Sequence, residues 1–224
     1  MKRILRLIIS KSARLRRIYL FIMTFYFKFF DRPYKPAGTT KAKQRRLKEG
    51  FFQKYTKGYG IDIGFGGDPI APNCRGWDIE DGDAQYLKGI KDNSFDFVYS
   101  SHTLEHMSDP AMSLRNWWRV LKTNGYLILY IPHRDLYEKK KNLPSKWNPD
   151  HKCFFLLDKD EMPDTIGIIP LIQRTLSNFE IIYAREYSQG HTITDPEIHS
   201  DGEFSIEVVV LKKPNSKKNI KWES

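Results

Sequence analysis

The stretch DIGFGG at residues 62–67 decides the fold. An apolar run of strand length, residues 59–63, leads directly into glycines, and the carboxylate of Asp62 comes two residues before the first of them. Glycine adopts positive φ angles easily and allows a ligand to come close to the backbone. Loops at the carboxyl ends of parallel strands form the ligand crevice of open α/β sheets. The alternative is a turn that only connects two strands.

The regions around this stretch alternate between strand and helix patterns. Further strands are predicted at residues 76–79, 95–100, 126–131, 179–184 and 205–211. Helical spacing spans 110–121, with Gly125 predicted at the left-handed end, and a basic helix is predicted from Thr39 or Thr40 to about residue 55. Residues 68–75 are too short and too rich in proline for a helix. The alternation predicts a doubly wound, mainly parallel α/β sheet with an antiparallel C-terminal strand pair.

Acidic residues near the glycines indicate the kind of ligand. Asp78 ends the next strand, where a carboxylate can accept hydrogen bonds from ribose hydroxyls. Asp83 and Ala84 follow, and could bind an adenine through one carboxylate and one backbone N–H. The dinucleotide pattern fits poorly, because residue 69 is proline and Asp78 lies only 14 residues after Gly64. An adenosine with a zwitterionic amino-acid tail fits better than a dinucleotide.

Five segments together resemble the class I S-adenosylmethionine-dependent methyltransferases, in particular the small bacterial type associated with surface-glycan assembly. They are IDIGFGGDPI at 61–70, GWDIEDGDA at 76–84, NSFDFVYSSHTLEHMSDP at 93–110, RVLKTNGYLILYIPH at 119–133 and NPDHKCFF at 148–155. The resemblance covers residues 60–157 and implies a Rossmann-like methyltransferase domain over residues 59–213.

The resemblance implies S-adenosylmethionine as the cofactor. It implies Asp62, Gly64, Phe65 and Gly66 near the methionine end, Asp78 at the ribose, Asp83 and Ala84 at the adenine, and Ser101 and His102 beneath the sulfonium. It also implies that Glu105 and His106, in the segment LEH, orient this floor loop rather than touch the substrate.

Two histidines are candidates for the general base. His133 follows a predicted strand at the crevice, and His151 lies in the excursion 135–158, which could fold over it. An imidazole can take a proton from an attacking hydroxyl near neutral pH. The alternative for each is a structural or substrate-orienting role. His191 and His199 are predicted at the surface. No metal site is predicted, because no set of His, Cys and carboxylate residues has the spacing of one helix face.

The positive charge of the chain is concentrated at its beginning. Lys and Arg number 37 against 27 Asp and Glu, for a net charge of +10. Residues 1–49 hold 15 basic and 2 acidic side chains (+13), which leaves 22 basic and 25 acidic (−3) for the rest. A binder of nucleic acid usually spreads positive charge over its body. The charges of Lys41–Lys48 are predicted to form a solvated face, the alternative being a phosphate contact.

Residues 1–30 have the pattern of a basic amphipathic helix followed by an aromatic-rich segment. This pattern favours attachment to an anionic membrane surface. The alternatives are a helix that packs on the body or on a partner subunit, and an uncleaved signal anchor. Residues 31–58 are predicted to form a linker and the basic helix, and residues 214–224 a basic tail. With two cysteines and no cleavage signal, a reducing, cytoplasmic location is expected, peripheral on the plasma membrane.

Three functions remain open at this point. The leading one is a methyltransferase that O-methylates a glycan or a lipid-linked glycan precursor at the cytoplasmic membrane face. The second is a nucleic-acid methyltransferase that uses the basic arm, which the charge distribution disfavours. The third is a non-catalytic module that binds S-adenosylmethionine. The acceptor atom and the oligomeric state do not follow from the sequence.

Overall fold

The computed structural model describes residues 38–215. The predicted arm at residues 1–30, the linker before residue 38 and the tail from residue 216 lie outside the described residues.

The centre of the molecule is a six-stranded sheet with the order β2-β1-β3-β4-β8-β7. Strands β2, β1, β3 and β4 are parallel, and β8 runs antiparallel to both β4 and β7. The mainly parallel α/β sheet and the antiparallel C-terminal pair are therefore confirmed. Only β7 is an edge strand of this pair, because β8 lies between β4 and β7. The strands are β1 (Gly60–Ile63), β2 (Cys74–Trp77), β3 (Phe95–Ser101), β4 (Leu121–Pro132), β7 (Phe179–Tyr187) and β8 (Ser205–Lys212).

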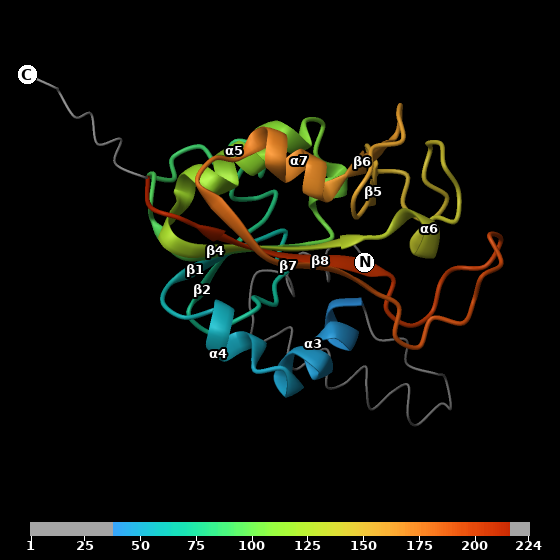
Figure 1. Ribbon diagram of the computed structural model, residues 1–224, viewed down its shortest axis with the longest axis horizontal. Helices are drawn as coiled ribbons and strands as arrows, with labels where there is room; N and C mark the ends of the chain where they lie inside the picture. Colours follow the sequence, from blue (N-terminus) through green and yellow to red (C-terminus); the bar gives the residue numbers. More distant parts are fainter. Residues whose placement is uncertain (1–37, 216–224) are drawn as a thin grey trace, which may run out of the picture.

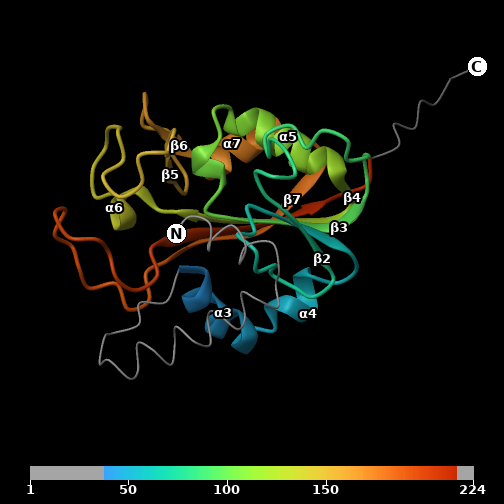
Figure 2. The same ribbon diagram turned by 180° about the vertical axis from the view of Figure 1, so that it is seen from behind.

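Helices cover both faces of the sheet (Figure 1). Helices α5 (Pro110–Val120) and α7 (Ile168–Thr175) lie on one face, and α3 (Gly38–Lys48) and α4 (Phe51–Tyr55) lie on the other. Figure 2 shows the remaining elements gathered at one end of the sheet, which is the carboxyl end of its parallel strands. They are α6 (Arg134–Tyr137) and a parallel pair formed by β5 (Phe154–Leu156) and β6 (Thr165–Gly167). A 3-10 turn, η1 (Leu104–His106), follows β3.

The predicted helix boundaries need two corrections. The basic helix is two helices, because Gly50 adopts a left-handed conformation (φ 64°) between α3 and α4. After α5, the left-handed residue is Asn124 (φ 65°) and not Gly125, and β4 already begins at Leu121. Gly125 is needed for a close approach instead, since a Cβ there would lie 2.7 Å from the backbone oxygen of Asp96.

The segment between β1 and β2 contains turns and no helix, as its short, proline-containing sequence predicted. The glycine loop therefore does not open the N-terminus of a helix, which is the feature that binds a pyrophosphate in dinucleotide folds.

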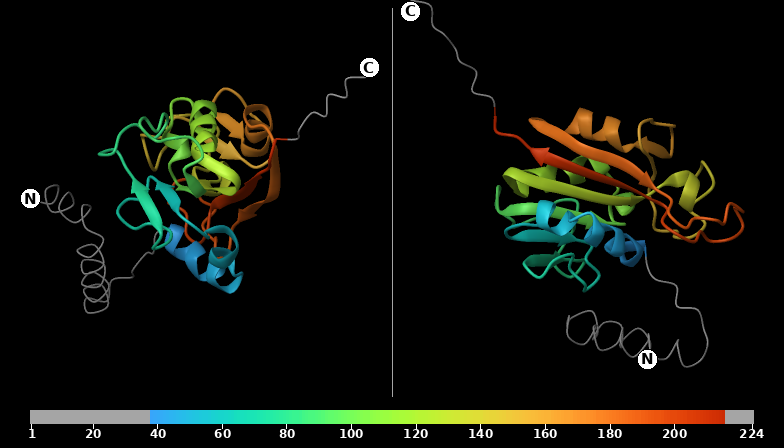
Figure 3. Two further views of the ribbon diagram at one scale, coloured as in Figure 1. Left: turned by 90° about the vertical axis from the view of Figure 1, so that its left-hand side faces the viewer. Right: turned by 60° about the horizontal axis from the view of Figure 1, so that its bottom comes forward.

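The two faces of the sheet carry different side chains because successive residues of a strand point to opposite sides. Towards α5 and α7 the strands are apolar, with Ile61, Val98 and Val208 all fully buried in the larger core cluster. Towards α3, which lies in front of the sheet in the right-hand view of Figure 3, a smaller apolar cluster is joined by ionisable side chains. None of the helices within residues 38–215 is long and apolar enough to cross a membrane.

Candidate functional site

The glycine loop after β1 is held against the chain that follows β3. Gly64 has a φ of 76°, and its N–H donates to the backbone oxygen of Trp77 (2.8 Å). A Cβ on Gly64 would lie 2.0 Å from Oγ1 of Thr103. Both the positive φ and the contact exclude a larger residue here. The ends of β1, β2 and β3 are thereby brought together at one edge of the sheet.

Asp78 and the glycine loop are joined directly. The Gly66 N–H donates to Oδ2 of Asp78 (3.1 Å), and the Ile79 N–H donates to its Oδ1 (2.9 Å). The ring of Phe65 lies where a Cβ on Gly76 would be, at 2.5 Å. Ile79, beside Asp78, is an apolar side chain that is 85% exposed. Its exposure is visible only in the structure, so sequence reasoning missed it.

Asp62 gives this loop an unusual charge. Its carboxylate is buried on the α3 face and accepts a hydrogen bond from the Ile70 N–H (2.7 Å). Its pKa is raised to about 7, mainly by burial; the hydrogen bond from Ile70 and the charge of Arg46 oppose the rise, and the negative charges of Asp68 and Asp78 add to it. A site crowded with carboxylates suits a cationic ligand. A pyrophosphate would be repelled by the carboxylates around this loop.

Asp83 and Ala84 form a turn after β2 and are not part of the Gly66–Asp78 contact. Oδ1 of Asp83 accepts from the Gln85 N–H (2.8 Å), while the carboxylate is otherwise exposed. The backbone oxygen of Ala84 accepts from Nε1 of Trp117 (2.8 Å). One of the two adjacent tryptophans of α5 therefore fixes the turn predicted to face an adenine.

His102 is the strained residue of the site. It follows Ser101 at the end of β3 and has a φ of 51°, a conformation that is uncommon for residues other than glycine and costs energy. Its N–H donates to the Tyr130 backbone oxygen (2.8 Å), and its Nε2 lies 3.2 Å from Oγ of Ser205. The side chain is 27% exposed, and its partial desolvation, together with the neighbouring His151 and His106, lowers its pKa below the usual value. The imidazole is therefore neutral at pH 7.

His133 has both ring nitrogens engaged. The Asp135 N–H donates to its Nδ1 (3.2 Å) at the start of α6, so the proton is on Nε2, which donates to Oε1 of Glu186 (3.1 Å). Proton uptake at His133 would require the loss of the bond from Asp135. The backbone nonetheless places it at the carboxyl end of β4, as predicted.

His151 lies apart from His133, in a buried group with other ionisable side chains. Its Nδ1 lies 3.1 Å from Oε1 of Glu138, and its Nε2 lies 3.8 Å from Oε1 of Glu105. Glu105 is completely buried, and burial raises its pKa to about 8. The predicted structural role of Glu105 did not include this grouping with His151, because 46 residues separate the two in the sequence.

The basic helix α3 corrects another prediction. Lys43 and Lys48 are solvated, but Arg46 is fully buried and Arg45 nearly so. Nε of Arg46 donates to Oε2 of Glu207 (2.7 Å) and its Nη1 to the Tyr99 hydroxyl (2.9 Å). These two arginines are the internal partners of buried acids, and neither forms part of a solvated face or of an exposed phosphate contact.

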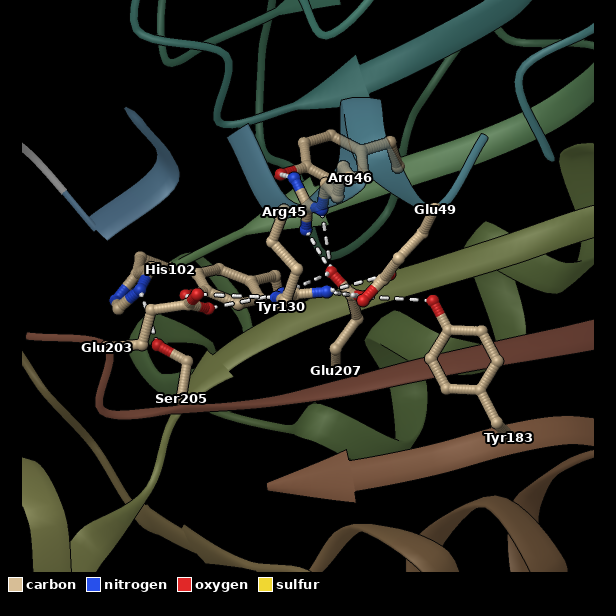
Figure 4. A network of polar contacts seen from close by, with 10 residues as sticks. Arg45, Arg46, Glu49, His102, Tyr130, Tyr183, Glu203, Ser205 and Glu207 are labelled. Atoms are coloured by element: carbon tan, nitrogen blue, oxygen red, sulfur yellow. Dashed lines mark hydrogen bonds and ion pairs between the residues drawn. The ribbon is translucent and has the colours of Figure 1, made fainter. Parts of the chain in front are cut away.

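The arginine network reaches the candidate site (Figure 4). Arg45 donates to Glu203 (3.3 Å from Nε to Oε1) and to Glu207 (3.1 Å from Nη1 to Oε1). The Tyr130 hydroxyl donates to Oε2 of Glu203 (3.1 Å) and is also hydrogen-bonded with Ser205, the residue that contacts His102. Helix α3 is thus connected through side chains to the floor of the site.

Comparison with known proteins agrees with the geometry of this edge. Residues 44–129 match the methyltransferase domain family. The matched segment contains the glycine loop, Asp78 and the floor residues after β3. The match supports a methyltransferase and implies S-adenosylmethionine as its cofactor.

Solved structures resemble the chain more distantly. A SAM-dependent methyltransferase from Thermotoga maritima is 19% identical, with a TM-score of 0.45, over 74% of this chain and 87% of that one. One from Aquifex aeolicus is 12% identical, with a TM-score of 0.44, over 80% and 100%. The cyclase SpnF is 17% identical, with a TM-score of 0.44. The match covers 64% of this chain but only 60% of the length of SpnF. These likenesses are too distant to indicate a substrate. No curated protein sequence matches the chain significantly.

Proposed function

We propose that the protein transfers a methyl group from S-adenosylmethionine to a hydroxyl of a glycan or lipid-linked glycan precursor. The observation that carries the proposal is the joined edge of Gly64, Gly66 and Asp78, with the strained His102 beside it. The carboxylates around Asp62 favour a cationic cofactor over a pyrophosphate.

The chain supplies binding and placement. Asp62, Gly64, Phe65 and Gly66 would hold the methionine end of the cofactor, Asp78 the ribose, and Asp83 and Ala84 the adenine. When bound, the cofactor supplies a methyl group that is already activated by the positive charge on sulfur. Ser101 and His102 would form the floor on which an acceptor hydroxyl is oriented, and a neutral His102 adds no repulsion to a nearby cation. Placement and exclusion of water can provide much of the rate.

A group of aromatic rings supports a sugar acceptor. Tyr137 and Phe204 lie 5.0 Å apart between ring centroids, and Trp147 and His199 lie 5.2 Å apart. The ring of Phe204 also contacts His102, at 6.0 Å. Aromatic rings bury the apolar faces of ligands and leave polar groups at their edges. Sugars have such faces, so this aromatic group would seat one beside the floor loop.

The cofactor assignment is tested by titration calorimetry with S-adenosylmethionine and its demethylated product. Replacing Asp78→Ala should cost about 1.5–3 kcal/mol, or roughly 10- to 150-fold in Kd, because a charged hydrogen-bond acceptor is lost. Glu80→Ala is the matched control, since Glu80 is exposed in the same turn, and it should leave Kd unchanged. Tight binding of NAD without binding of S-adenosylmethionine would overturn the assignment.

The acceptor class is tested by mass spectrometry of the host's surface glycans, with and without this chain. Loss of one methyl group from a defined sugar would identify the acceptor, whereas unchanged glycans would contradict the proposal.

The general base is tested by comparing His133→Ala and His151→Ala under single-turnover conditions. The variant that lacks the acting base should turn over roughly 10²–10⁴-fold more slowly, while its binding of the cofactor is retained.

Attachment to the membrane through residues 1–30 belongs to the same proposal. It rests on the charge of +13 in residues 1–49 and on the aromatic segment. Each basic residue near an anionic surface contributes about 1 kcal/mol, which salt weakens, while apolar insertion is not screened. High salt should therefore release only part of the protein from anionic vesicles, and deletion of residues 1–30 nearly all of it. Full-length protein that stays unbound at low salt would exclude membrane attachment.

A further inference from the structure

A second group of side chains at this edge has the composition of a metal site. Glu105 and His106 belong to η1 after β3, and His151 comes from the loop before β5. One ligand atom from each lies within 4.8 Å of the others. Oε1 of Glu105 lies 3.9 Å from Nε2 of His106 and 3.8 Å from Nε2 of His151. Both imidazoles therefore turn the same nitrogen towards one carboxylate oxygen.

The buried carboxylate of Glu105 has no hydrogen-bond partner within residues 38–215 that would compensate for its burial. Its side chain is only 1% exposed, and no other described residue donates a hydrogen bond to either of its oxygens. Buried polar atoms are nearly always hydrogen-bonded, because an unpaired one loses its hydration without compensation. Nδ1 of His102 lies 3.7 Å from the same oxygen, and the distances of 3.7, 3.8 and 3.9 Å are all too long for hydrogen bonds to the imidazoles. An ion between the three groups would satisfy the carboxylate.

Each of the two histidines is oriented by a further polar contact, as histidines that bind metals usually are. Nδ1 of His151 lies 3.1 Å from Oε1 of Glu138, and this buried carboxylate is itself held by the Ser145 hydroxyl and the Lys146 N–H. His106 has a backbone hydrogen bond with Asp150, next to His151. A carboxylate behind a histidine fixes its tautomer and leaves the other nitrogen free to bind a metal.

We propose that Glu105, His106 and His151 bind one divalent transition-metal ion, with Zn²⁺ as the ion of matching preference. Two imidazoles and one carboxylate suit zinc, and three protein ligands leave one position open, as in catalytic sites. With bonds of about 2.0–2.1 Å, the ligand atoms of a tetrahedral site lie about 3.3 Å apart. The two pairs that include Glu105 must therefore close by roughly half an ångström, and the two imidazole nitrogens, which lie within 4.8 Å of each other, by up to about 1.5 Å. His106 is 27% exposed, which gives the ion access to solvent.

The ion would tie the loop before β5 to η1. These two segments already meet in the backbone, where the Lys152 N–H donates to the Glu105 oxygen (2.7 Å). Nε2 of His151 would be occupied by the metal and could not accept a proton. Of the two candidate bases in the proposed function, only His133 would then remain.

The test uses full-length protein without a histidine tag, stripped with a chelator and titrated with Zn²⁺ and with Co²⁺. One ion per chain should bind, and the Co²⁺ form should show the visible absorption of a low-coordinate site. Glu105→Gln, which keeps the shape of the side chain, should weaken binding more than about 100-fold. Glu138→Gln, behind His151, should weaken it by about 10- to 100-fold.

His191→Ala is the matched control, because His191 lies outside the group and pairs with Asp201. It should bind the ion as tightly as the unaltered protein. Zn²⁺ should also raise the unfolding temperature of the unaltered protein and not that of Glu105→Gln, which checks that the variant is folded and lacks only the site. Absence of stoichiometric binding by the unaltered protein, or equal binding by folded Glu105→Gln, would overturn the proposal.

Discussion

The two faces of the central sheet are covered in opposite ways, although the same strands supply both. The face under α5 and α7 is apolar, with Leu114 and Trp117 of α5 fully buried against the strands. The face under α3 carries Asp62 of β1 and Glu207 of β8, both buried, and the latter is paired with Arg46. Helix α5 therefore packs on the sheet through apolar side chains, whereas α3 packs on it largely through charged ones.

This difference has an energetic meaning. Apolar burial stabilises in proportion to area and tolerates exchanges of similar volume. A buried ion pair is expensive to desolvate, so it adds little net stability, but removal of one partner leaves an uncompensated charge. Helix α3 should therefore be the more sensitive of the two to single substitutions. Because its network extends to Ser205 and His102, the sensitivity should reach the candidate site as well.

The largest effect is expected for Glu207→Ala. It removes the acceptor of Arg46 and of the Tyr183 hydroxyl (2.8 Å) and leaves a buried guanidinium unpaired. We expect a loss of about 3–5 kcal/mol in the free energy of unfolding, measured by urea denaturation. Glu180→Ala is the control, because Glu180 is a half-exposed acid on β7 paired with Lys213, and it should change stability by less than about 0.5 kcal/mol. Equal losses would mean that the pair does not hold α3.

Leu114→Ala probes the apolar face by the same measurement. Leu114 is 0% exposed on α5, so truncation should cost about 2–5 kcal/mol from lost burial and the cavity that remains. Leu114→Met conserves volume and should cost less than about 1.5 kcal/mol. On the α3 face, Arg46→Lys keeps the charge but loses the forked geometry of the guanidinium. This conservative exchange should therefore cost more stability than Leu114→Met. Similar costs for the two conservative exchanges would remove the distinction between the faces.

The sequence predicts the apolar face well and the charged face poorly. Strands such as residues 126–131 and the helix around Leu114 are recognisable because apolar periodicity is a local signal. The glycine loop and Asp78 are local signals too, and the structure joins them at 3.1 Å. The Arg46–Glu207 pair is separated by 161 residues, so nothing near Arg46 distinguishes it from a solvated arginine.

The grouping of Glu105 with His151 escaped prediction for the same reason. Metal ligands on one helix can be recognised in a sequence by their spacing. Glu105 and His106 instead lie in η1, and His151 lies in a loop beyond β4. The break of the basic helix at Gly50 was readable in principle, since glycine commonly ends helices. It was missed because the basic pattern continues on both sides.

A smaller effect is expected from the pH dependence of Asp62. Burial raises its pKa to about 7, from a usual value near 4, so the protonated form is favoured by folding. Its contribution to stability is fully present below the unfolded pKa and is lost as the pH rises through the folded value. Between pH 5 and pH 8 the unaltered protein should lose about 2–3 kcal/mol relative to Asp62→Asn, measured by urea denaturation at each pH. Parallel pH profiles for the two proteins would show that another group compensates Asp62.

In the proposed function, Asp62 also links this face to the cofactor. The groups that face it are the Ile70 N–H, Arg46 from α3, and the carboxylates of Asp68 and Asp78. A cationic ligand stabilises the ionised form, so binding of S-adenosylmethionine should tighten between pH 6 and pH 8 in the unaltered protein. In Asp62→Asn that pH dependence should be absent, as calorimetry at matched pH values can check.

The smallest effect is expected at the start of α5, and it tests what holds the helix of the apolar face. Oδ1 of Asp109 accepts a hydrogen bond from the Met112 N–H (2.8 Å), and Pro110 occupies the first turn. Asp109→Ala should cost about 1 kcal/mol, because a free N–H at the helix start loses its acceptor, while Asp109→Asn keeps an acceptor and should cost only a few tenths. If both variants cost the same, the charge of Asp109 on the helix dipole matters more than the hydrogen bond. A loss for Asp109→Ala as large as that for Leu114→Ala would mean that α5, like α3, depends on polar contacts at a single point, and the contrast between the two faces would no longer hold.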